Sequence, residues 1–356
     1  MFGWSRVFKR FFGWFQREPP CLPVFWTLQS VYLARALYVV AELKIADLIV
    51  ERPMSSAELA SVTRTDEQSL HRILRALAAF GIFAENSRGE FEMTEPAACL
   101  REDVVGSVRD WTVLTGTKPT WDAFGEALEV VRTGRCGFEL AHGEAGDLYR
   151  YCRQDSEFSE TFIRAQSNWT DWQRDAILEA YDFSKFPTIV DVGGGRGSMI
   201  SGILRRCPET KGVLCDQPQT IELAKTVIAN AGVADRCQLA PGNFLENVPE
   251  GGDAYVIKHV LRDWDDANAG TILRNCHQAM GPNGTLLLID AVLDPRNSRD
   301  RIVKLLDLEQ MFWLSGSLRT MDAWKRLLGA SGFRIQQCHK TKIVDAIIVQ
   351  AVKTGG

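Results

Sequence analysis

The chain has 356 residues, which is enough for one large domain or for two ordinary domains that each bury their own core. An apolar content of 46% with 24% charged residues is typical of a soluble globular protein. The net charge of −4 argues against nucleic acid as the main partner, because binding to nucleic acid requires a basic surface.

The nine cysteines form no C-x-x-C pair, and their odd number does not suit a disulfide framework. We therefore predict reduced and mostly buried thiols in an intracellular, cytoplasmic protein without a metal site. The sequence contains no uninterrupted run of about 18 apolar residues, so no membrane-spanning helix is predicted.

Residues 1–20 form a distinct aromatic and basic segment. It lacks the apolar centre and the cleavage site of a signal peptide. The segment can dock on a partner subunit, contact a membrane surface through residues 1–17, or stay a disordered tail, and these alternatives remain open. At helical spacing the aromatic residues share one face and the basic residues the other: Trp4, Phe8, Phe11 and Phe15 against Arg6, Lys9, Arg10 and Arg17.

Residues 21–105 are predicted to fold as helices followed by a small hairpin. Ser55 suits the N-cap of one helix, with Glu58 three residues later. A further helix opens at Asp66 and closes at Gly81. The turn NSRG then separates two short alternating segments, as in the two-stranded wing of a winged helix.

A winged helix serves either DNA binding or packing between subunits. The segment Ser69–Leu77 would be the recognition helix in a DNA-binding protein. Basic residues near that segment are few, and Leu, Ile and Ala dominate it. We therefore favour a dimerisation module, with DNA binding as the alternative.

Residues 106–182 show helical patterns and are rich in tryptophan. Aromatic side chains at this density can line a substrate cavity, although most of them are expected to form core. We assign this stretch as a helical linker and substrate-pocket region. Its tryptophans are Trp111, Trp121, Trp169 and Trp172.

From residue 183 to residue 356 strand and helix patterns alternate. Such alternation predicts a parallel sheet with helices on both faces, an α/β fold. The two final segments form a hairpin that adds antiparallel strands to one edge. The predicted strands are TIVDV, GVLCD, CQLAPG, DAYVIKHVL, GTLLLIDAVL, RIQQCHKT and DAIIVQAVK.

The stretch VDVGGGRGS follows the first of these strands and opens a helix. Glycines at such a turn let the backbone approach a ligand closely, and the helix N-terminus adds partial positive charge. A dinucleotide site needs the spacing G-x-G-x-x-G. Here Gly193, Gly195 and Gly197 give G-x-G-x-G, with Ser198 at the place of the third dinucleotide glycine.

Two acids flank this turn. Asp191 precedes the glycines, and Asp216 ends the next strand. A carboxylate at the second position can accept both ribose hydroxyls of an adenosine group, or it can cap the following helix. The glycine turn nearby favours the ribose role.

The motifs DVGGGRG, CDQPQTIE, GNFLENVPEGGDAYVIKHVLRDWDD, LLLIDAVL and SLRT resemble the class I S-adenosylmethionine-dependent methyltransferases. From about Thr27 onward the chain looks like their small-molecule O-methyltransferase branch, which includes plant caffeate enzymes, acetylserotonin methyltransferase and bacterial natural-product enzymes. The resemblance implies a Rossmann-like seven-stranded methyltransferase domain after an N-terminal winged-helix domain. It also implies S-adenosyl-L-methionine as cofactor, a small-molecule acceptor and a homodimer.

The resemblance also assigns cofactor-binding residues. The glycine turn and the acid before it would hold the methionine part, and Asp216 the ribose. Asn243 and Phe244 stand where the family usually has Asp and Met, and both can still meet the adenine. The implied cofactor residues are Asp191, Gly193, Gly195, Gly197, Asp216, Gln217, Asn243, Phe244 and Lys258.

The resemblance breaks down at the general base. The family pattern His-Asp-Trp is replaced here by Arg262, Asp263 and Trp264. Arginine stays protonated at any working pH and cannot remove a proton. The two acids that orient the family histidine also differ, since Asp290 is shorter than the usual Glu and Leu318 replaces the other. The His-based mechanism is therefore predicted to be absent.

Three residues can take over parts of the role of the missing histidine. Arg262 can stabilise a phenolate, as an oxyanion hole does. His259 can act as a base or be a satisfied structural histidine. Glu309, beside Gln310 in a segment that resembles the acceptor pocket of relatives, is another candidate base.

We predict methyl transfer to a hydroxyl of an aromatic or lipophilic secondary metabolite. Positioning alone is worth an effective molarity of about 10⁵ M or more, so an acidic phenol can react without a base. Two alternatives stay open: non-methylating chemistry at the same cofactor site, such as hydroxylation or a pericyclic step, and a catalytically silent subunit.

Overall fold

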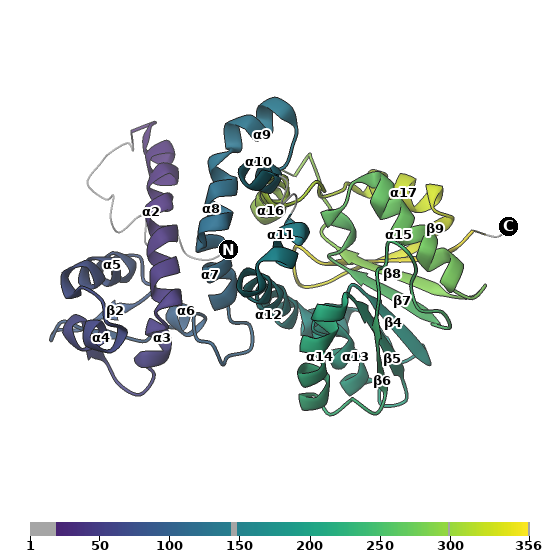
Figure 1. The fold of residues 1–356 in the computed structure, drawn as a ribbon, viewed down its shortest axis with the longest axis horizontal. Helices are drawn as coiled ribbons and strands as arrows, with labels where there is room; N and C mark the ends of the chain where they lie inside the picture. The colour runs from purple at the N-terminus through teal and green to yellow at the C-terminus, as the bar shows by residue number, and fades with distance from the viewer. Residues whose placement is uncertain (1–18, 144–147, 298–299, 355–356) are drawn as a thin grey trace. The chain divides into compact units, whose positions relative to one another are not determined.

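The computed structural model describes residues 19–143, 148–297 and 300–354. The predicted amphipathic segment falls almost entirely on residues 1–18 and so lies outside the described residues. The chain divides into two compact units, one ending at Arg101 and one beginning at Glu102 (Figure 1). Residues 106–182 belong to the second unit together with the sheet.

The first unit is mainly helical, with a three-stranded sheet in the order β1-β3-β2. Two predicted helix starts are confirmed. Ser55 and Glu58 form a reciprocal capping box at the start of α4, and Asp66 accepts a hydrogen bond from the Ser69 backbone N–H at the start of α5. The predicted wing is the β2–β3 hairpin. The elements are α2 (Leu22–Glu42), α3 (Ile45–Leu48), β1 (Met54–Ser55), α4 (Ser56–Thr63), α5 (Glu67–Ala79), β2 (Ala84–Glu85), β3 (Glu90–Glu92) and α6 (Glu95–Ala98).

Helix α2 bears on the expectation that no helix spans a membrane. It is long and apolar enough to cross a membrane by length and composition, although interspersed polar residues hide this from a search for uninterrupted apolar runs. Core helices and signal sequences pass the same test, so a single such helix is weak evidence. Its apolar side chains are exposed within the first unit: Val24, Phe25, Leu28, Val31 and Tyr32.

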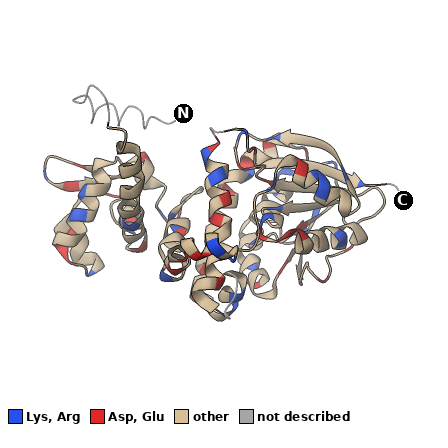
Figure 2. Ribbon diagram, turned by 90° about the horizontal axis from the view of Figure 1, so that it is seen from above, with Lys and Arg blue, Asp and Glu red and all other residues tan. Residues whose placement is uncertain are grey.

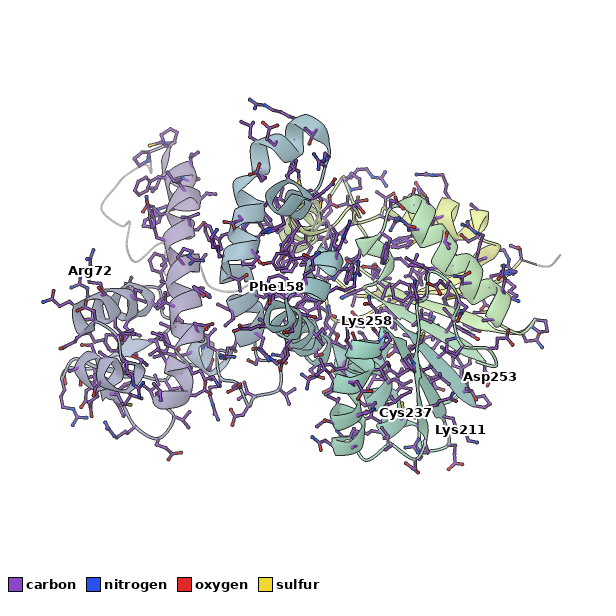
Figure 3. The ribbon with its side chains drawn as sticks, in the orientation of Figure 1. Arg72, Phe158, Lys211, Cys237, Asp253 and Lys258 are labelled. Carbon is purple, nitrogen blue, oxygen red and sulfur yellow. The ribbon has the colours of Figure 1, made fainter. Side chains whose placement is uncertain are left out.

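Over residues 19–101 of the first unit, charges of both signs are mixed. Figure 2 shows acidic and basic residues interspersed along the chain. Arg72 on α5 points away from the helix core in Figure 3, and Leu70, Leu74 and Leu77 of the same helix are buried. Helix α5 is thus committed to packing through its apolar face.

The second unit contains a seven-stranded sheet in the order β6-β5-β4-β7-β8-β10-β9. The five strands from β6 to β8 are parallel, and β10 runs antiparallel to both β8 and β9, which confirms the predicted terminal hairpin. The strands are β4 (Thr188–Val192), β5 (Lys211–Asp216), β6 (Cys237–Pro241), β7 (Ala254–Lys258), β8 (Thr285–Asp290), β9 (Phe333–Lys340) and β10 (Ile347–Lys353).

Successive strand residues point to opposite faces of the sheet, and their side chains contribute to two apolar cores, one on each face. On β7, Val256 packs with α12, α13 and α14, whereas Tyr255 and Ile257 pack with α15 and α17. Helices α7, α8, α10 and α11, with parts of α12 and α16, form a further aromatic core. The helices are α7 (Arg109–Gly116), α8 (Lys118–Gly125), α9 (Ala127–Thr133), α10 (Gly137–His142), α11 (Leu148–Gln154), α12 (Ser156–Ala180), α13 (Ser198–Arg206), α14 (Pro218–Asn230), α15 (Asp266–Ala279), α16 (Arg301–Trp313) and α17 (Met321–Ala330).

The tryptophans of the helical region pack largely on one another. The Trp111 ring stacks between Trp169 and Trp313, with centroids 5.8 Å from each. Such stacking gives rigid core. Of the predicted tryptophans, Trp111, Trp121 and Trp169 are partly buried and Trp172 is 51% exposed, so only part of the set contributes to the core.

Strand β7 is shorter than the sequence predicted. The expected strand ran on through Leu261, but β7 ends at Lys258 because His259 adopts a left-handed backbone with φ of 55°. A short 3-10 helix, η2 (Leu261–Asp263), follows. Because η2 is not a strand, the alternation of side chains along a strand does not predict where its side chains point.

Arg319, in the loop between α16 and α17, holds η2 in place. Its guanidinium donates to the Leu261 carbonyl at 2.6 Å, to the Trp264 carbonyl at 2.7 Å and to the Asp266 carboxylate at 2.8 Å. Only 4% of Arg319 is exposed, and its guanidinium lies over the Trp324 ring. A planar fork of donors suits this task in a way that a lysine does not.

Gly316 lies in the same loop as Arg319 and allows that loop to approach η2 closely. A Cβ at this position would lie 1.9 Å from the Arg262 carbonyl oxygen and 2.5 Å from the Asp263 carbonyl carbon. Both are backbone atoms, so a side chain can be accommodated only if η2 moves.

Gly316→Ala is expected to lower stability by about 1 to 3 kcal/mol, the usual cost of overpacking. Calorimetry should show a lower Tm, by about 2–4 °C for each kcal/mol in a unit of this size. Gly329→Ala in α17 is the matched control, because nothing lies within 4 Å of its Cβ position. An unchanged Tm for Gly316→Ala would contradict the close approach of the two segments.

Candidate active site

A cleft lies where β4, β5 and β7 end, with α11 and α12 along its other side. Figure 3 places Lys258 where the sheet meets the preceding helices. The cleft brings together most of the residues that the sequence singled out for the cofactor: Asp191, Gly193, Gly195, Asp216, Gln217 and Lys258. Predicted residues that do not line it are Gly197, Asn243, Phe244, Arg262, Asp290 and Glu309.

The glycine turn is fixed by backbone geometry and by packing. Gly193, Gly195 and Gly197 have φ values of 69°, 59° and 83°, a region that side chains disfavour. A Cβ on Gly193 would lie 2.7 Å from Val260, and one on Gly197 would lie 2.8 Å from Ile228. A Cβ on Gly195 would meet nothing within 4 Å, so this glycine faces the open cleft. The turn thus offers bare backbone to a ligand.

Asp216 is held by the same turn. Its carboxylate accepts the backbone N–H of Gly195 at 2.8 Å and that of Gln217 at 2.7 Å. Burial raises the pKa of Asp216, while these two N–H groups oppose the shift. A carboxylate has about four acceptor sites, so it retains capacity for two hydroxyl donors from the cleft.

Asp191 has no such partners. It is 1% exposed, and neither of its carboxylate oxygens has a hydrogen-bond partner of good geometry among the described residues. Burial raises the pKa of Asp191 to about 7, with the Lys258 ammonium opposing the shift. A buried carboxylate whose hydrogen bonding is limited to a weak contact with the Ile200 backbone N–H is a place for a cationic or hydrogen-bonding group of a ligand.

Asn243 and Phe244 lie outside the wall of this cleft. The exposed Asn243 side chain donates to Glu246 at 2.9 Å and accepts the Leu245 backbone N–H at 3.1 Å, so it organises its own loop. Phe244 lies edge-on to Trp264, with ring centroids 6.0 Å apart. Its ring is also 3.4 Å from the Cβ position of Gly193.

Arg262 is a buried guanidinium with little hydrogen bonding. Its side chain is 7% exposed, and its Nη1 lies 3.6 Å from Oδ1 of Asp290. Neither Nε nor Nη1 has a hydrogen-bond partner among the described residues, and Oδ2 of Asp290 also lacks one. Unsatisfied buried donors of this kind are costly, and an anionic ligand would satisfy them.

Three carboxyl groups interact electrostatically with this guanidinium: Asp263 and Asp290 are buried, and Glu309 is partly exposed. Burial raises the pKa of Asp263 and of Asp290 to about 6 and that of Glu309 to about 7, and in each case the Arg262 charge opposes the shift. Near neutral pH the cluster can therefore exchange protons. Within the described residues no group of three or more His, Cys, Asp or Glu side chains is placed to hold a metal ion.

Glu309 and Leu318 belong to apolar surroundings. Glu309 lines a groove between α8 and α16 together with Phe124, Leu305 and Phe312, not the cleft beside the glycine turn. Leu318 is 5% exposed and packs with a small apolar cluster. The position at which the resemblance implies an acid is thus filled by a packed aliphatic side chain.

Asp263 is anchored by a residue that the sequence analysis missed. The Tyr149 hydroxyl donates to its carboxylate at 2.6 Å, and the Tyr149 ring stacks on Trp264 with centroids 5.8 Å apart. Tyr149 lies on α11 and lines the cleft. The two partners are 114 positions apart, and no local pattern marks such a contact.

His259 uses both ring nitrogens. Nε2 lies 3.2 Å from the Asp345 carbonyl oxygen, and Nδ1 lies 3.3 Å from Nζ of Lys258. Burial, together with the Arg262 and Lys258 charges, lowers the pKa of His259 well below its usual value. These contacts leave no ring nitrogen for an acceptor and favour the structural role over the catalytic one.

Comparisons with known proteins agree with this geometry. The O-methyltransferase domain profile matches residues 121–334, and the O-methyltransferase dimerisation domain profile matches residues 26–103. A phenazine O-methyltransferase of Lysobacter antibioticus is 38% identical over 87% of this chain and 90% of its own length. An 8-amino-8-demethylriboflavin N,N-dimethyltransferase of Streptomyces davaonensis is 34% identical over 89% and 91%.

Solved structures match over nearly the whole chain. The crystal structure of LaPhzM superimposes with a TM-score of 0.90 at 36% identity, covering 95% of this chain and 100% of that one. CalO1, a methyltransferase of calicheamicin biosynthesis solved with S-adenosylhomocysteine bound, gives a TM-score of 0.79 at 29% identity, covering 94% and 98%. The open glycine turn and the two cleft acids fit the same kind of cofactor. The chain belongs to the O-methyltransferase family of natural-product biosynthesis, with an N-terminal dimerisation domain and S-adenosylmethionine as its cofactor.

Proposed function

We propose that the protein methylates a hydroxyl group of a flat aromatic or lipophilic metabolite without a histidine base. The observation that carries the proposal is Arg262, a buried guanidinium whose Nε and Nη1 have no hydrogen-bond partner among the described residues. It stands at the position of the family base, two residues after a residue that lines the cofactor cleft.

The residues of the cleft have separable roles in this proposal. S-adenosylmethionine, when bound, supplies a methyl group on a positively charged sulfur. The glycine turn approaches the cofactor through bare backbone, and Asp216 accepts its ribose hydroxyls. Asp191 meets its amino group, since a cation there satisfies the two carboxylate oxygens that otherwise lack partners.

Arg262 selects the acceptor by charge. A guanidinium beside the reacting atom stabilises an oxygen that carries negative charge, and a preorganised donor of this kind is worth about 10²–10³ in kcat. A neutral aromatic amine gains nothing from that cation. The relatives include an enzyme named for a phenazine and one named for an aminoriboflavin, so a polycyclic aromatic acceptor fits, and Arg262 favours oxygen over nitrogen.

A second candidate function is non-methylating chemistry at the same site. It is favoured by the joint change of the base and its two orienting acids, because Leu318 is apolar and Asp290 pairs with Arg262. In that case the guanidinium would stabilise charge in a hydroxylation or pericyclic step.

Incubation with methyl-labelled S-adenosylmethionine and a panel of hydroxyphenazines, hydroxynaphthoates and hydroxyquinones tests the main proposal. We expect label in at least one hydroxylated acceptor and none in its O-methylated counterpart. If calorimetry shows tight cofactor binding and no acceptor is labelled, the non-methylating function gains and the proposed one fails.

Arg262→Gln should lower kcat by at least about 10²-fold, because it removes the charge beside the acceptor oxygen. The Kd for the cofactor should stay nearly unchanged, since Arg262 does not line its cleft. Arg326→Gln on the exposed face of α17 is the matched control. A rise in kcat on Arg262→His, with no loss on Arg262→Gln, would show that Arg262 stabilises no anion.

Cofactor binding should weaken below pH 7. The pKa of Asp191 is raised to about 7, and a bound ammonium group favours the ionised carboxylate. Protons then compete with the cofactor, and Kd should rise by up to about tenfold for each pH unit below that value. Calorimetry between pH 5.5 and 8.5 measures this slope. Asp191→Asn should bind weakly at every pH and show no slope, and a slope that persists in this variant would point to another group.

A further inference from the structure

We propose that Asp345, which does not line the cofactor cleft, is a positioning residue that holds Lys258 in place for S-adenosylmethionine. Asp345 lies in the loop before β10 and is 1% exposed. Lys258 ends β7 and lines the cleft. The inference rests on the role of Lys258 in holding the cofactor, and it is independent of the acceptor that the protein methylates.

The side chain of Asp345 holds helix α12. Its Oδ2 accepts a hydrogen bond from Nε2 of Gln173 at 2.7 Å and another from Nε1 of Trp169 at 3.1 Å. These two donors are four residues apart and so lie on the same face of the helix. Hydrogen bonds to a carboxylate are stronger than those between neutral groups. One buried acid thus fixes a whole turn of α12 against the loop before β10.

This turn of α12 supplies the first hydrogen-bond acceptor for Lys258. Thr170 lies within it and lines the cofactor cleft. The Thr170 hydroxyl donates to the Gln166 carbonyl at 3.0 Å, and Oγ1 lies 3.2 Å from Nζ of Lys258. Because the single hydroxyl hydrogen is already engaged, Oγ1 accepts a hydrogen bond from Lys258.

The backbone of Asp345 controls the second acceptor, which is His259. The Asp345 carbonyl oxygen lies 3.2 Å from Nε2 of His259, and Nδ1 of the same ring lies 3.3 Å from Nζ of Lys258. A carbonyl can only accept, so Nε2 carries the hydrogen and Nδ1 of the neutral ring accepts from Lys258. Desolvation, with the charges of Arg262 and Lys258, lowers the pKa of His259 well below its usual value, so the ring stays neutral.

The two acceptors determine where the remaining donor of Lys258 points. An ammonium group has three N–H bonds in a tetrahedral arrangement, so two fixed hydrogen bonds also fix the direction of the third. The cofactor then meets a donor that is already oriented, and its binding does not have to order a long and flexible side chain. Because Asp345 places both acceptors, it preorganises Lys258 without touching the cofactor.

The charge of Asp345 acts in the same sense. Desolvation, followed by the Arg262 charge, lowers the pKa of Lys258 to about 7. Asp345, Asp290 and Asp191 oppose this shift, and Asp345 has the largest effect of the three. Its carboxylate therefore favours the ammonium form, which has one donor more than the amine.

A double-mutant cycle separates this role from simple packing. Asp345→Ala should raise the Kd for S-adenosylhomocysteine, measured by calorimetry, by about tenfold or more, the effect of losing a hydrogen bond to a charged group. Lys258→Met removes the donors and should raise the Kd as well. When Lys258→Met is already present, Asp345→Ala should add less than about twofold, because residues that act through one another are not additive.

Two results of this cycle would overturn the proposal. One is an unchanged Kd in Asp345→Ala. The other is a further rise of more than about twofold when Asp345→Ala is added to Lys258→Met, since additive effects indicate independent sites. The cycle uses the demethylated cofactor and no acceptor, so its result does not depend on whether the protein methylates a hydroxyl group.

Asp253→Ala is the matched control. Asp253 precedes β7 and Lys258 ends it, so the two residues flank opposite ends of this strand (Figure 3). The Asp253 carboxylate accepts the Thr188 backbone N–H at 2.8 Å and ties two strands together. Its loss should lower Tm and leave the Kd for S-adenosylhomocysteine unchanged. A rise in Kd as large as that of Asp345→Ala would show that general loosening of the sheet explains both.

Trp169→Phe carries the same test if Asp345→Ala does not fold. It keeps an aromatic ring against Trp111 and removes only the indole N–H that Asp345 accepts. The Kd for S-adenosylhomocysteine should rise by about two- to tenfold, the range for one lost hydrogen bond, and should not rise further in combination with Lys258→Met. An unchanged Kd in Trp169→Phe, or an equal rise with and without Lys258, would contradict the positioning role.

Discussion

The left-handed backbone at His259 is the constraint on which the rest of the site depends. It stops β7 at Lys258 and turns the chain into η2, so that Lys258 stays in the cofactor cleft while Arg262 faces the buried acids. A non-glycine residue in this region costs about 1–3 kcal/mol and persists only when its surroundings hold it. The Asp345 carbonyl holds the His259 ring, and the three hydrogen bonds of Arg319 hold the turn that follows.

The electrostatics of the site follow from this turn. Burial of a guanidinium costs desolvation free energy, which burial of a neutral histidine does not. The folded state tolerates this charge only if nearby anions or a ligand compensate for the cost. Asp263, Asp290 and Glu309 supply that compensation in part, and their own pKa values stay raised because burial outweighs the Arg262 charge. The Arg262 charge lowers the pKa of the three carboxyl groups against the effect of burial, whereas for Lys258 it lowers the pKa in the same direction as burial does.

The fold could be predicted from the sequence because the patterns that indicate it are local. Alternating strands and helices, the Asp66 N-cap and the glycine turn each lie within a few residues, and the sheet and its terminal hairpin follow from them. Contacts between distant segments could not be predicted in this way. Examples are the hydrogen bond from Tyr149 to Asp263 and that from Arg319 to η2. The predicted strand that became β7 was also too long, because an apolar run does not indicate a residue with a positive φ.

The same limit applies to the candidate bases. Nearness to Arg262 in the sequence favours His259, and likeness to an acceptor pocket favours Glu309. Catalytic competence depends instead on which donors and acceptors a side chain has left over, and only the hydrogen-bond network shows that. Both ring nitrogens of His259 are engaged, one by the Asp345 carbonyl and one by Lys258, which favours its structural role. Through these two contacts the His259 ring ties the end of β7 to the loop before β10, so the residue that ends the strand also helps to hold the turn that follows it.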